Sequence, residues 1–211
     1  IDANGNVALT GDASANARPI SEINGTPTTQ RFSPYDHLKY DKTLHGGSID
    51  FRNGNNYYRA PFSITGVNNI TVEAWIYMEN VTTHNVIYTQ YPDSNPTNYP
   101  GRHLFYVSSG TSQLQYWTSS DGVSSHSHVL KLNTWYHVAY VKSGNTVKLY
   151  VNGNGETGVG THDVTIFNEN LTIGAVPENS NWFAGQISDL RITYNDTTYT
   201  GDFTPPTAPL S

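Results

Sequence analysis

The acidic side chains are the first candidates for chemistry in this chain. Retaining hydrolysis of a glycosidic bond needs two carboxyl groups about 5 Å apart. Glu73 and Glu79 fall on one face of the predicted strand ITVEAWIYME. However, six residues of strand at about 3.3 Å each separate these two carboxylates by about 20 Å. They cannot act as a pair on one strand, although a pair built from distant segments stays open.

Nucleophilic and metal-dependent chemistry has little support in the sequence. It contains no Gly-x-Ser-x-Gly nucleophile elbow. Cysteine is absent, which excludes a disulfide framework and a zinc–thiolate site. His126 and His128 would place two imidazoles on one strand face, but no acidic partner lies near them in the sequence. We therefore interpret them as an exposed or loop pair.

Two tryptophans in polar surroundings are the strongest candidates for ligand binding. Trp117 borders the polar hairpin LQYWTSSDG, and Trp182 lies with Asn181 in the loop ENSNWF. Tyr99 lies in a loop over residues 92–102 that holds three prolines. Loops of that length are uncommon in compact domains and are frequently functional. These aromatic rings are predicted ligand platforms, with local packing of the loops as the alternative.

The composition limits the class of protein. The chain has 211 residues, a formal net charge of -6 and only 13% charged residues, with 15 Tyr, 7 Phe and 4 Trp. The aromatic content argues against disorder, and the negative charge argues against nucleic-acid binding. No apolar run approaches membrane-spanning length, so membrane insertion is not expected. Abundant uncharged polar residues are typical of an extracellular or virion-surface β-protein.

The elements that must position these side chains are short strands. Alternating or β-branched stretches recur roughly every ten residues, with no helical period. They predict strands at residues 47–51, 57–58, 70–79, 86–91, 104–107, 114–118, 135–141, 147–151, 164–166, 171–173 and 185–192. This spacing predicts an all-β sandwich or jelly roll. We expect an extended arm or linker at 1–34, the domain at 35–204 and a Pro-rich linker at 205–211, as in a fragment of a larger modular protein.

Several segments in order resemble a known family. They are GSIDF, ITVEAWIYM, WYHVAYV followed by KLYVNG, LTIG and FAGQISDLRI. Together they resemble the laminin G-like branch of the concanavalin A-like lectin/glucanase superfamily over roughly residues 35–206. The ending TGDFTPPTAP resembles versions in phage and viral structural proteins and in large bacterial surface proteins. The resemblance implies a two-sheet antiparallel jelly-roll sandwich with Trp75 and Trp135 as packing residues of core strands.

The resemblance also implies ligands and ions. In this superfamily carbohydrates usually bind on the concave face or at rim loops, and aromatic rings and amides suit sugar C–H faces and hydroxyls. Many laminin G-like domains hold calcium through oxygen ligands. By position in the motif, Asp50 and Asp189 are the predicted calcium ligands. Many relatives have a second acidic residue where this chain has Ser188, and ion pairs with Arg52 or Arg191 are the alternative.

We therefore predict a non-catalytic, lectin-like domain of a larger virion or cell-surface protein, such as a phage tail or receptor-binding component. Its partners would be a glycan or cell-surface polysaccharide and other modules of the same protein, with homo-oligomerisation left open. The alternative is a structural or assembly module that binds no glycan. A glycoside hydrolase is disfavoured, because the E-x-D-x-x-E cluster of laminarinase-type relatives is absent.

Overall fold

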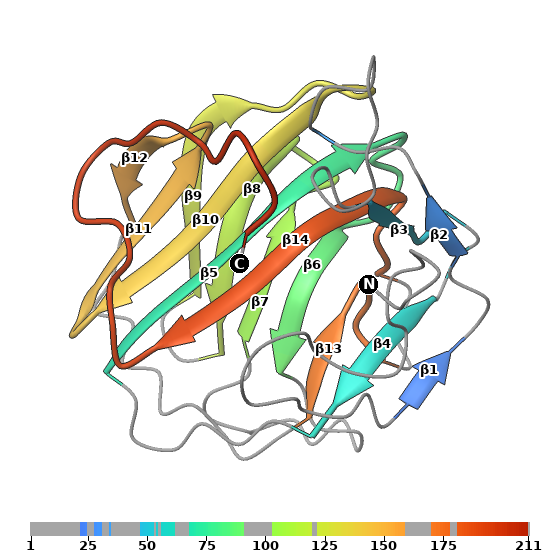
Figure 1. Cartoon of the computed structure of the whole chain (residues 1–211), viewed down its shortest axis with the longest axis horizontal. Helices are drawn as coiled ribbons and strands as arrows, with labels where there is room; N and C mark the ends of the chain where they lie inside the picture. Colours follow the sequence, from blue (N-terminus) through green and yellow to red (C-terminus); the bar gives the residue numbers. More distant parts are fainter. Residues whose placement is uncertain are drawn as a thin grey trace.

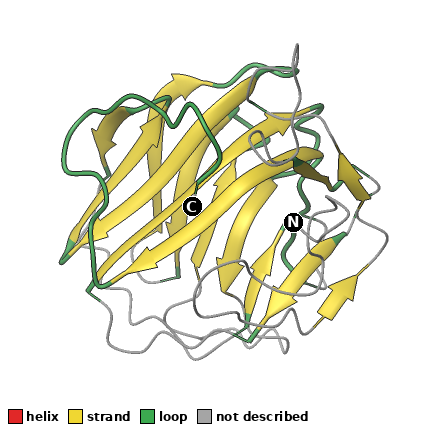
Figure 2. Cartoon of the chain, in the orientation of Figure 1, coloured by secondary structure: helices red, strands yellow, loops and turns green. Residues whose placement is uncertain are grey.

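The computed structural model describes residues 22–24, 28–30, 34, 47–52, 54, 56–61, 68–90, 103–119, 122–158, 170–177 and 181–210. These residues form strands and loops without any helix, and so contain no helix able to cross a membrane (Figure 2). The strands in chain order are β1 (Glu22–Asn24), β2 (Thr28–Gln30), β3 (Ser48–Asp50), β4 (Tyr57–Ala60), β5 (Asn69–Met78), β6 (Asn85–Gln90), β7 (His103–Val107), β8 (Gln113–Thr118), β9 (Gly122–Val129), β10 (Trp135–Ser143), β11 (Thr146–Val151), β12 (Asn154–Thr157), β13 (Leu171–Ile173) and β14 (Gly185–Tyr194).

The strands make two sheets, which confirms the predicted all-β, two-sheet antiparallel sandwich (Figure 1). One sheet, called the β6 sheet here, has the order β1-β4-β13-β6-β7-β8-β9. The other, the β5 sheet, has the order β12-β11-β10-β5-β14-β3-β2. Every pairing between neighbouring strands is antiparallel.

The core lies between the sheets and follows from the period of two along each strand. On β5 the side chains of Val72, Ala74 and Ile76 face inward and are fully buried. The rings of Tyr116 on β8 and Tyr140 on β10 stack with centroids 3.8 Å apart, joining the two sheets. Because successive side chains alternate, the residues between the core positions must point away from the sandwich. The outer faces therefore carry the functional candidates.

The two sheets also meet at one edge, through β9 and β12. The Ser127 amide and hydroxyl both donate to the Glu156 carboxylate. His126 is buried, its Nδ1 lies 3.7 Å from that carboxylate, and its Nε2 lies 3.0 Å from the Asn154 carbonyl oxygen. The expectation that the histidine pair has no acidic partner was therefore wrong for His126, because folding brings Glu156 to it from another sheet. His128 is exposed, as predicted.

The structure differs from the predicted strand and domain ranges in several segments. Within the predicted arm, β1 pairs with β4 and β2 pairs with β3, so each extends one sheet. Strands β9 and β12 carry too little apolar alternation to be predicted. The predicted strand 164–166 lies outside the described residues. The domain boundaries at 34 and 204 stay predictions.

The C-terminal segment after β14 runs back across the outer face of the β5 sheet (Figure 1). Tyr199 and Phe203 pack against Ala139, Val141 and Tyr150 of β10 and β11. The rings of Tyr199 and Phe203 stack 3.5 Å apart, and the Phe203 amide donates to the Gly153 carbonyl. Part of this face is thus closed by the chain itself.

Candidate functional site

The outer face of the β6 sheet carries an apolar cluster that includes a candidate tryptophan. Leu104 and Tyr106 of β7, Val86 of β6 and Val176 from the loop after β13 are buried there. Trp117 of β8 is half-buried and packs against this cluster. Part of the indole is therefore supported from beneath while part remains accessible. A ring held in this way is a suitable platform for a flat apolar ligand face.

The loop between β13 and β14 brings Asn181 to the same cluster. The Val176 amide donates to the Asn181 carbonyl at 3.0 Å, and the His84 amide donates to Asn181 Oδ1 at 3.4 Å. The His84 ring contacts the Tyr106 ring edge-on, with centroids 4.9 Å apart. Burial lowers the pKa of His84, and its Nδ1 accepts a hydrogen bond from the Ser109 amide. Trp117 and Asn181 therefore border one surface, although they are far apart in sequence.

Amide side chains flank the tryptophan along β8. Gln113, Gln115 and Trp117 share the outer face because they alternate with core residues. Gln115 Nε2 donates to the Ser125 hydroxyl at 3.0 Å, and Gln113 Nε2 donates to the Ser127 carbonyl. These groups are half-exposed or exposed, so they can exchange their hydrogen bonds with a ligand. We call this area, from Gln115 and Trp117 to His84 and Asn181, the Trp117 surface.

The other two predicted binding residues lie elsewhere or outside the described chain. Trp182 is half-buried, forms an isolated β-bridge with Ala175 and lies beside the turn before β4, where a Cβ on Gly54 would approach its indole to 3.8 Å. Its role as a ligand platform stays a prediction. Tyr99 lies outside the described residues. His84 and Tyr106 were missed, because neither has a local pattern that distinguishes it from a packing residue.

The sequence and the fold agree with one family. The model of the concanavalin A-like lectin/glucanases superfamily, laminin G type, matches residues 52–198, which is more than half of the chain. The chain belongs to this laminin G-like family. None of the curated proteins has a sequence that matches it.

Solved structures similar to this laminin G-like domain share its fold at low identity. Domain 4 of AbnA, a GH43 extracellular arabinanase from Geobacillus stearothermophilus solved with arabinotriose, has TM-score 0.55 and 21% identity, over 82% of this chain and 84% of that one. The laminin α1 LG4-5 domains from mouse have TM-score 0.55 and 12% identity, over 78% of this chain and 48% of that one. A SAP-like pentraxin from Limulus polyphemus has TM-score 0.50 and 20% identity, over 64% of this chain and 68% of that one.

The two predicted calcium ligands lie at different points along the neighbouring strands β3 and β14 of this laminin G-like domain. Arg52 holds the Asp50 carboxylate, with Nε–Oδ1 2.9 Å and Nη2–Oδ2 2.5 Å. Asp50 pairs with Gln186 on β14, whereas Asp189 lies three residues further along, about 10 Å away. Asp189 occupies a bulge with φ 50°. No cluster of three or more metal-ligating side chains occurs among the residues described. Calcium therefore stays a prediction from the resemblance.

A buried carboxylate lies on the outer face of the β5 sheet. Glu73 of β5 is fully buried and accepts hydrogen bonds from Arg191 Nε at 2.9 Å and from the Tyr199 hydroxyl at 2.6 Å. His137 Nε2 lies 3.1 Å from the same carboxylate, and Arg191 Nη2 lies 2.7 Å from it. Burial alone would raise the pKa of Glu73, but these hydrogen bonds outweigh it and hold the pKa below its usual value. Glu73 therefore anchors the C-terminal segment as a carboxylate.

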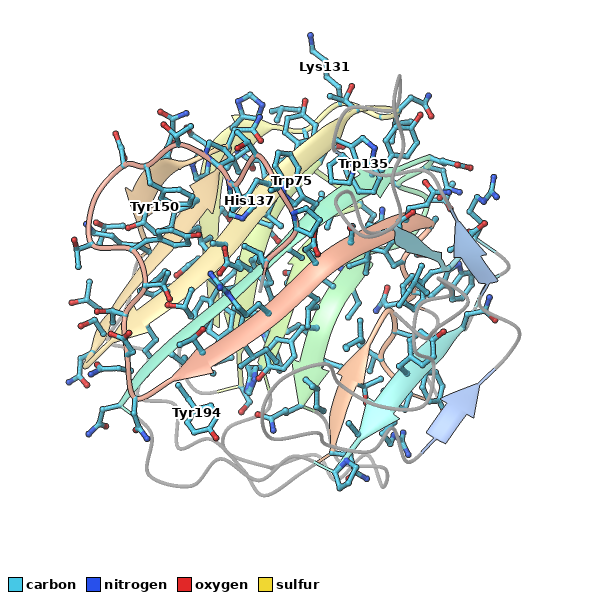
Figure 3. The ribbon with its side chains drawn as sticks, in the orientation of Figure 1. Trp75, Lys131, Trp135, His137, Tyr150 and Tyr194 are labelled. Atoms are coloured by element: carbon cyan, nitrogen blue, oxygen red, sulfur yellow. The ribbon has the colours of Figure 1, made fainter. Side chains whose placement is uncertain are left out.

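Trp75 and Trp135, predicted as packing residues of core strands, lie on β5 and β10 and point outward from the sandwich. Their strand neighbours Ala74, Ile76 and Tyr136 are the core residues, so the two indoles must face away from the sandwich. Both are half-buried (Figure 3). The strand pattern is apolar on both faces, so periodicity alone could not identify the inner one.

Proposed function

We propose that this laminin G-like domain is a non-catalytic carbohydrate-binding module that docks a glycan on the Trp117 surface. The observation that carries the proposal is the half-exposed Trp117 indole, held on a buried apolar cluster and flanked by side-chain amides. Sugars offer C–H faces to an aromatic ring and hydroxyls to amides, so this pair of chemistries matches them. The related AbnA domain was solved with arabinotriose, which supports the ligand class.

The carboxylates support binding without cleavage. Glu73 is fully buried and hydrogen-bonded to Arg191 and Tyr199, which leaves it no access to a substrate. Asp50 is held by the Arg52 guanidinium. A hydrolase needs a free acid and a free base or nucleophile on either side of the bond to be cleaved. We infer that both groups serve folding. A reducing-end assay with each bound polysaccharide tests this, since turnover would contradict it.

We further propose that the domain works outside the cell or on a virion surface, as one module of a larger protein. Shallow binding at a sheet face gives weak affinity for each site, and multiple copies raise the avidity without new contacts. A phage tail or other receptor-binding protein would provide such copies. The uncharged polar composition supports an exposed setting.

Affinity electrophoresis through native gels that contain arabinan, xylan, β-glucan or galactomannan tests the glycan proposal. We expect at least one polymer to retard the wild-type chain. Trp117→Ala should weaken that binding about tenfold or more, since truncating an anchoring tryptophan typically costs about 2 kcal/mol. Leu132→Ala, which removes another surface side chain (40% exposed), is the matched control and should leave retardation unchanged. Equal retardation of both variants would contradict the assignment to Trp117.

An assembly module is the second candidate, and the edge strand β9 favours it. Val123 and Val129 on β9 are 41% and 56% exposed, and the strand ends the β6 sheet. Exposed apolar edge strands are templates for pairing with another chain. Light scattering separates the two functions: a concentration-dependent dimer that Val129→Lys abolishes, with no glycan binding, would favour assembly.

A further inference from the structure

The strand register builds two cross-strand rows on the outer face of the β5 sheet, away from the Trp117 surface. In the first row Trp135 of β10 lies opposite Tyr77 of β5, Tyr77 opposite Gln186 of β14, and Gln186 opposite Asp50 of β3. All four point outward, because the neighbouring Ile76 and other inward residues belong to the core. Three gaps of about 4.8 Å give the row a length of about 14 Å.

The second row lies two residues further along the same strands and contains the next aromatic residues. His137 lies opposite Trp75, and Trp75 lies opposite Ser188. The Trp135 and Tyr77 rings are 5.5 Å apart at 51°, and the Trp75 and His137 rings are 5.3 Å apart at 73°. Trp75, Tyr77 and Trp135 are each half-buried. Figure 3 shows Trp75, Trp135 and His137 close together over the β5 sheet.

The C-terminal segment closes only one side of this area. Phe203 reaches the His137 ring, with centroids 5.6 Å apart. Tyr199 contacts the same histidine from the Glu73 side. The segment thus packs on the β10 and β11 end of the face and leaves partial exposure at Trp75, Tyr77 and Trp135. A chain-built wall beside a half-exposed aromatic floor gives the area a defined border.

The β14 and β3 end of the first row supplies hydrogen-bonding groups. Gln186 is buried, with 3% of its surface exposed, and its Nε2 donates to the Glu79 carboxylate at 3.2 Å. Its Oε1 has no hydrogen-bond partner among the described residues, and a buried acceptor left unpaired costs about 1–3 kcal/mol. Arg52 contacts both Asp50 and Glu79. Gln186 therefore acts on a ligand through Glu79, whose side chain is 33% exposed, and not by direct contact.

The charges at this end indicate which sugars would be accepted. One guanidinium, Arg52, faces two carboxylates, Asp50 and Glu79, so the local balance is negative. The whole chain also carries a net charge of -6. An acidic sugar would be repelled, whereas a neutral one would meet both the rings and the polar groups without that cost.

We propose that these two rows, called the Trp135 surface, form a second glycan-binding site that takes a short stretch of a neutral polysaccharide. The apolar faces of the sugar rings would lie over Trp135, Tyr77 and Trp75, and hydroxyls would reach the Glu79 carboxylate, which is 33% exposed and is held by Gln186. This inference rests on the proposed carbohydrate-binding function but names a separate site. The two surfaces lie on opposite faces of one sandwich, so one short oligosaccharide cannot contact both. One domain would therefore hold two segments of polymer and gain avidity over a free oligosaccharide.

Affinity electrophoresis of four proteins tests the second site: wild type, Trp117→Ala, Trp135→Ala and Gln186→Leu. The gels contain arabinan, xylan, β-glucan or galactomannan, with polygalacturonate as the acidic polymer. Gln186→Leu nearly keeps side-chain volume, so it tests the site even if Trp135→Ala folds poorly, and melting curves check each variant. We expect Trp135→Ala and Gln186→Leu each to weaken binding to a neutral polymer about fivefold to tenfold, and Trp117→Ala to retain residual binding.

The outcomes separate the second site from the proposed function. If a polymer retards the wild type and Trp117→Ala removes all binding while both other variants match the wild type, the Trp135 surface is overturned and the proposed function stands. If no polymer retards the wild type, the proposed function fails, and the second site fails with it. Tighter binding of polygalacturonate than of every neutral polymer would overturn the assignment to neutral sugars.

Discussion

Replacing Glu73 by Gln should destabilise the fold strongly at neutral pH. The carboxylate is fully buried and has three charged or polar partners: Arg191, His137 and Tyr199. Removing one partner of a buried ion pair typically costs about 3–5 kcal/mol, because the remaining charge loses its compensation. Glu73→Gln keeps the volume and removes the charge. Because the Arg191 side chain is 35% exposed and can be partly solvated, we expect the free energy of unfolding to fall by about 3 kcal/mol, the lower end of that range, and the melting temperature by about 6–12 °C for a domain of this size.

The loss of stability in Glu73→Gln should become smaller as the pH falls. The pKa of Glu73 lies below its ordinary value of 4.5, since hydrogen bonds from His137, Tyr199 and Arg191 outweigh the opposing effect of burial. A carboxylate with a lowered folded pKa contributes its full stability above pH 4.5, and the contribution disappears as the pH falls through the folded pKa. The difference between wild type and Glu73→Gln should therefore shrink between pH 7 and pH 3.

Urea denaturation at pH 7, pH 5 and pH 3 measures this difference. Glu79→Gln is the control, since Glu79 is 33% exposed and its contact with Arg52 spans 3.4 Å. Such exposed pairs contribute about 0–1 kcal/mol. A loss below about 1 kcal/mol at pH 7 for Glu73→Gln, or a loss that is the same at pH 7 and pH 3, would refute the reasoning.

Three further outcomes follow from the same contacts. Tyr199→Phe removes one hydrogen bond to the Glu73 carboxylate, so chemical denaturation should show that the free energy of unfolding falls by about 1.5–3 kcal/mol. An unchanged denaturation midpoint would contradict the role of Glu73 in anchoring the C-terminal segment. Gly153→Ala places a Cβ onto the Phe203 carbonyl at a residue with φ +82°, so proteolysis should release the C-terminal segment faster than in wild type. Because Arg52 already holds Asp50, millimolar CaCl₂ should shift the melting temperature by less than about 1 °C, whereas a clear rise would support the calcium site that the family resemblance implies.

The sequence predicts the scaffold well because the scaffold is periodic. Residues 70–79 were predicted as one strand and form β5, and periodicity also predicted the strand pair at 135–141 and 147–151, which form β10 and β11. Strand β9, with the sequence GVSSHSHV, was missed, because it is mostly polar and its contacts with Glu156 come from a segment 29 residues away. Local pattern identifies strands whose faces differ in polarity, and it fails where distant groups stabilise a polar strand.

The candidate site was only partly predictable. Trp117 and Asn181 were selected from their polar surroundings, and the structure places them around one apolar cluster. For Trp75 and Trp135 the sequence predicted only packing within core strands, because alternation reveals which residues share a face but not which face is inside. Contacts between distant segments distinguish the two faces. On the outer face, for example, Tyr199 of the C-terminal segment donates to Glu73, more than a hundred residues away in the sequence.

A glycan array with the multivalent domain tests the central claim most directly. The chain is displayed on a multimeric carrier and screened with and without calcium, so that weak single-site binding is detected through avidity. The account predicts binding to at least one class of neutral glycan, which millimolar free sugar competes away and which Trp117→Ala lowers. Failure to bind any glycan under either condition would contradict the account.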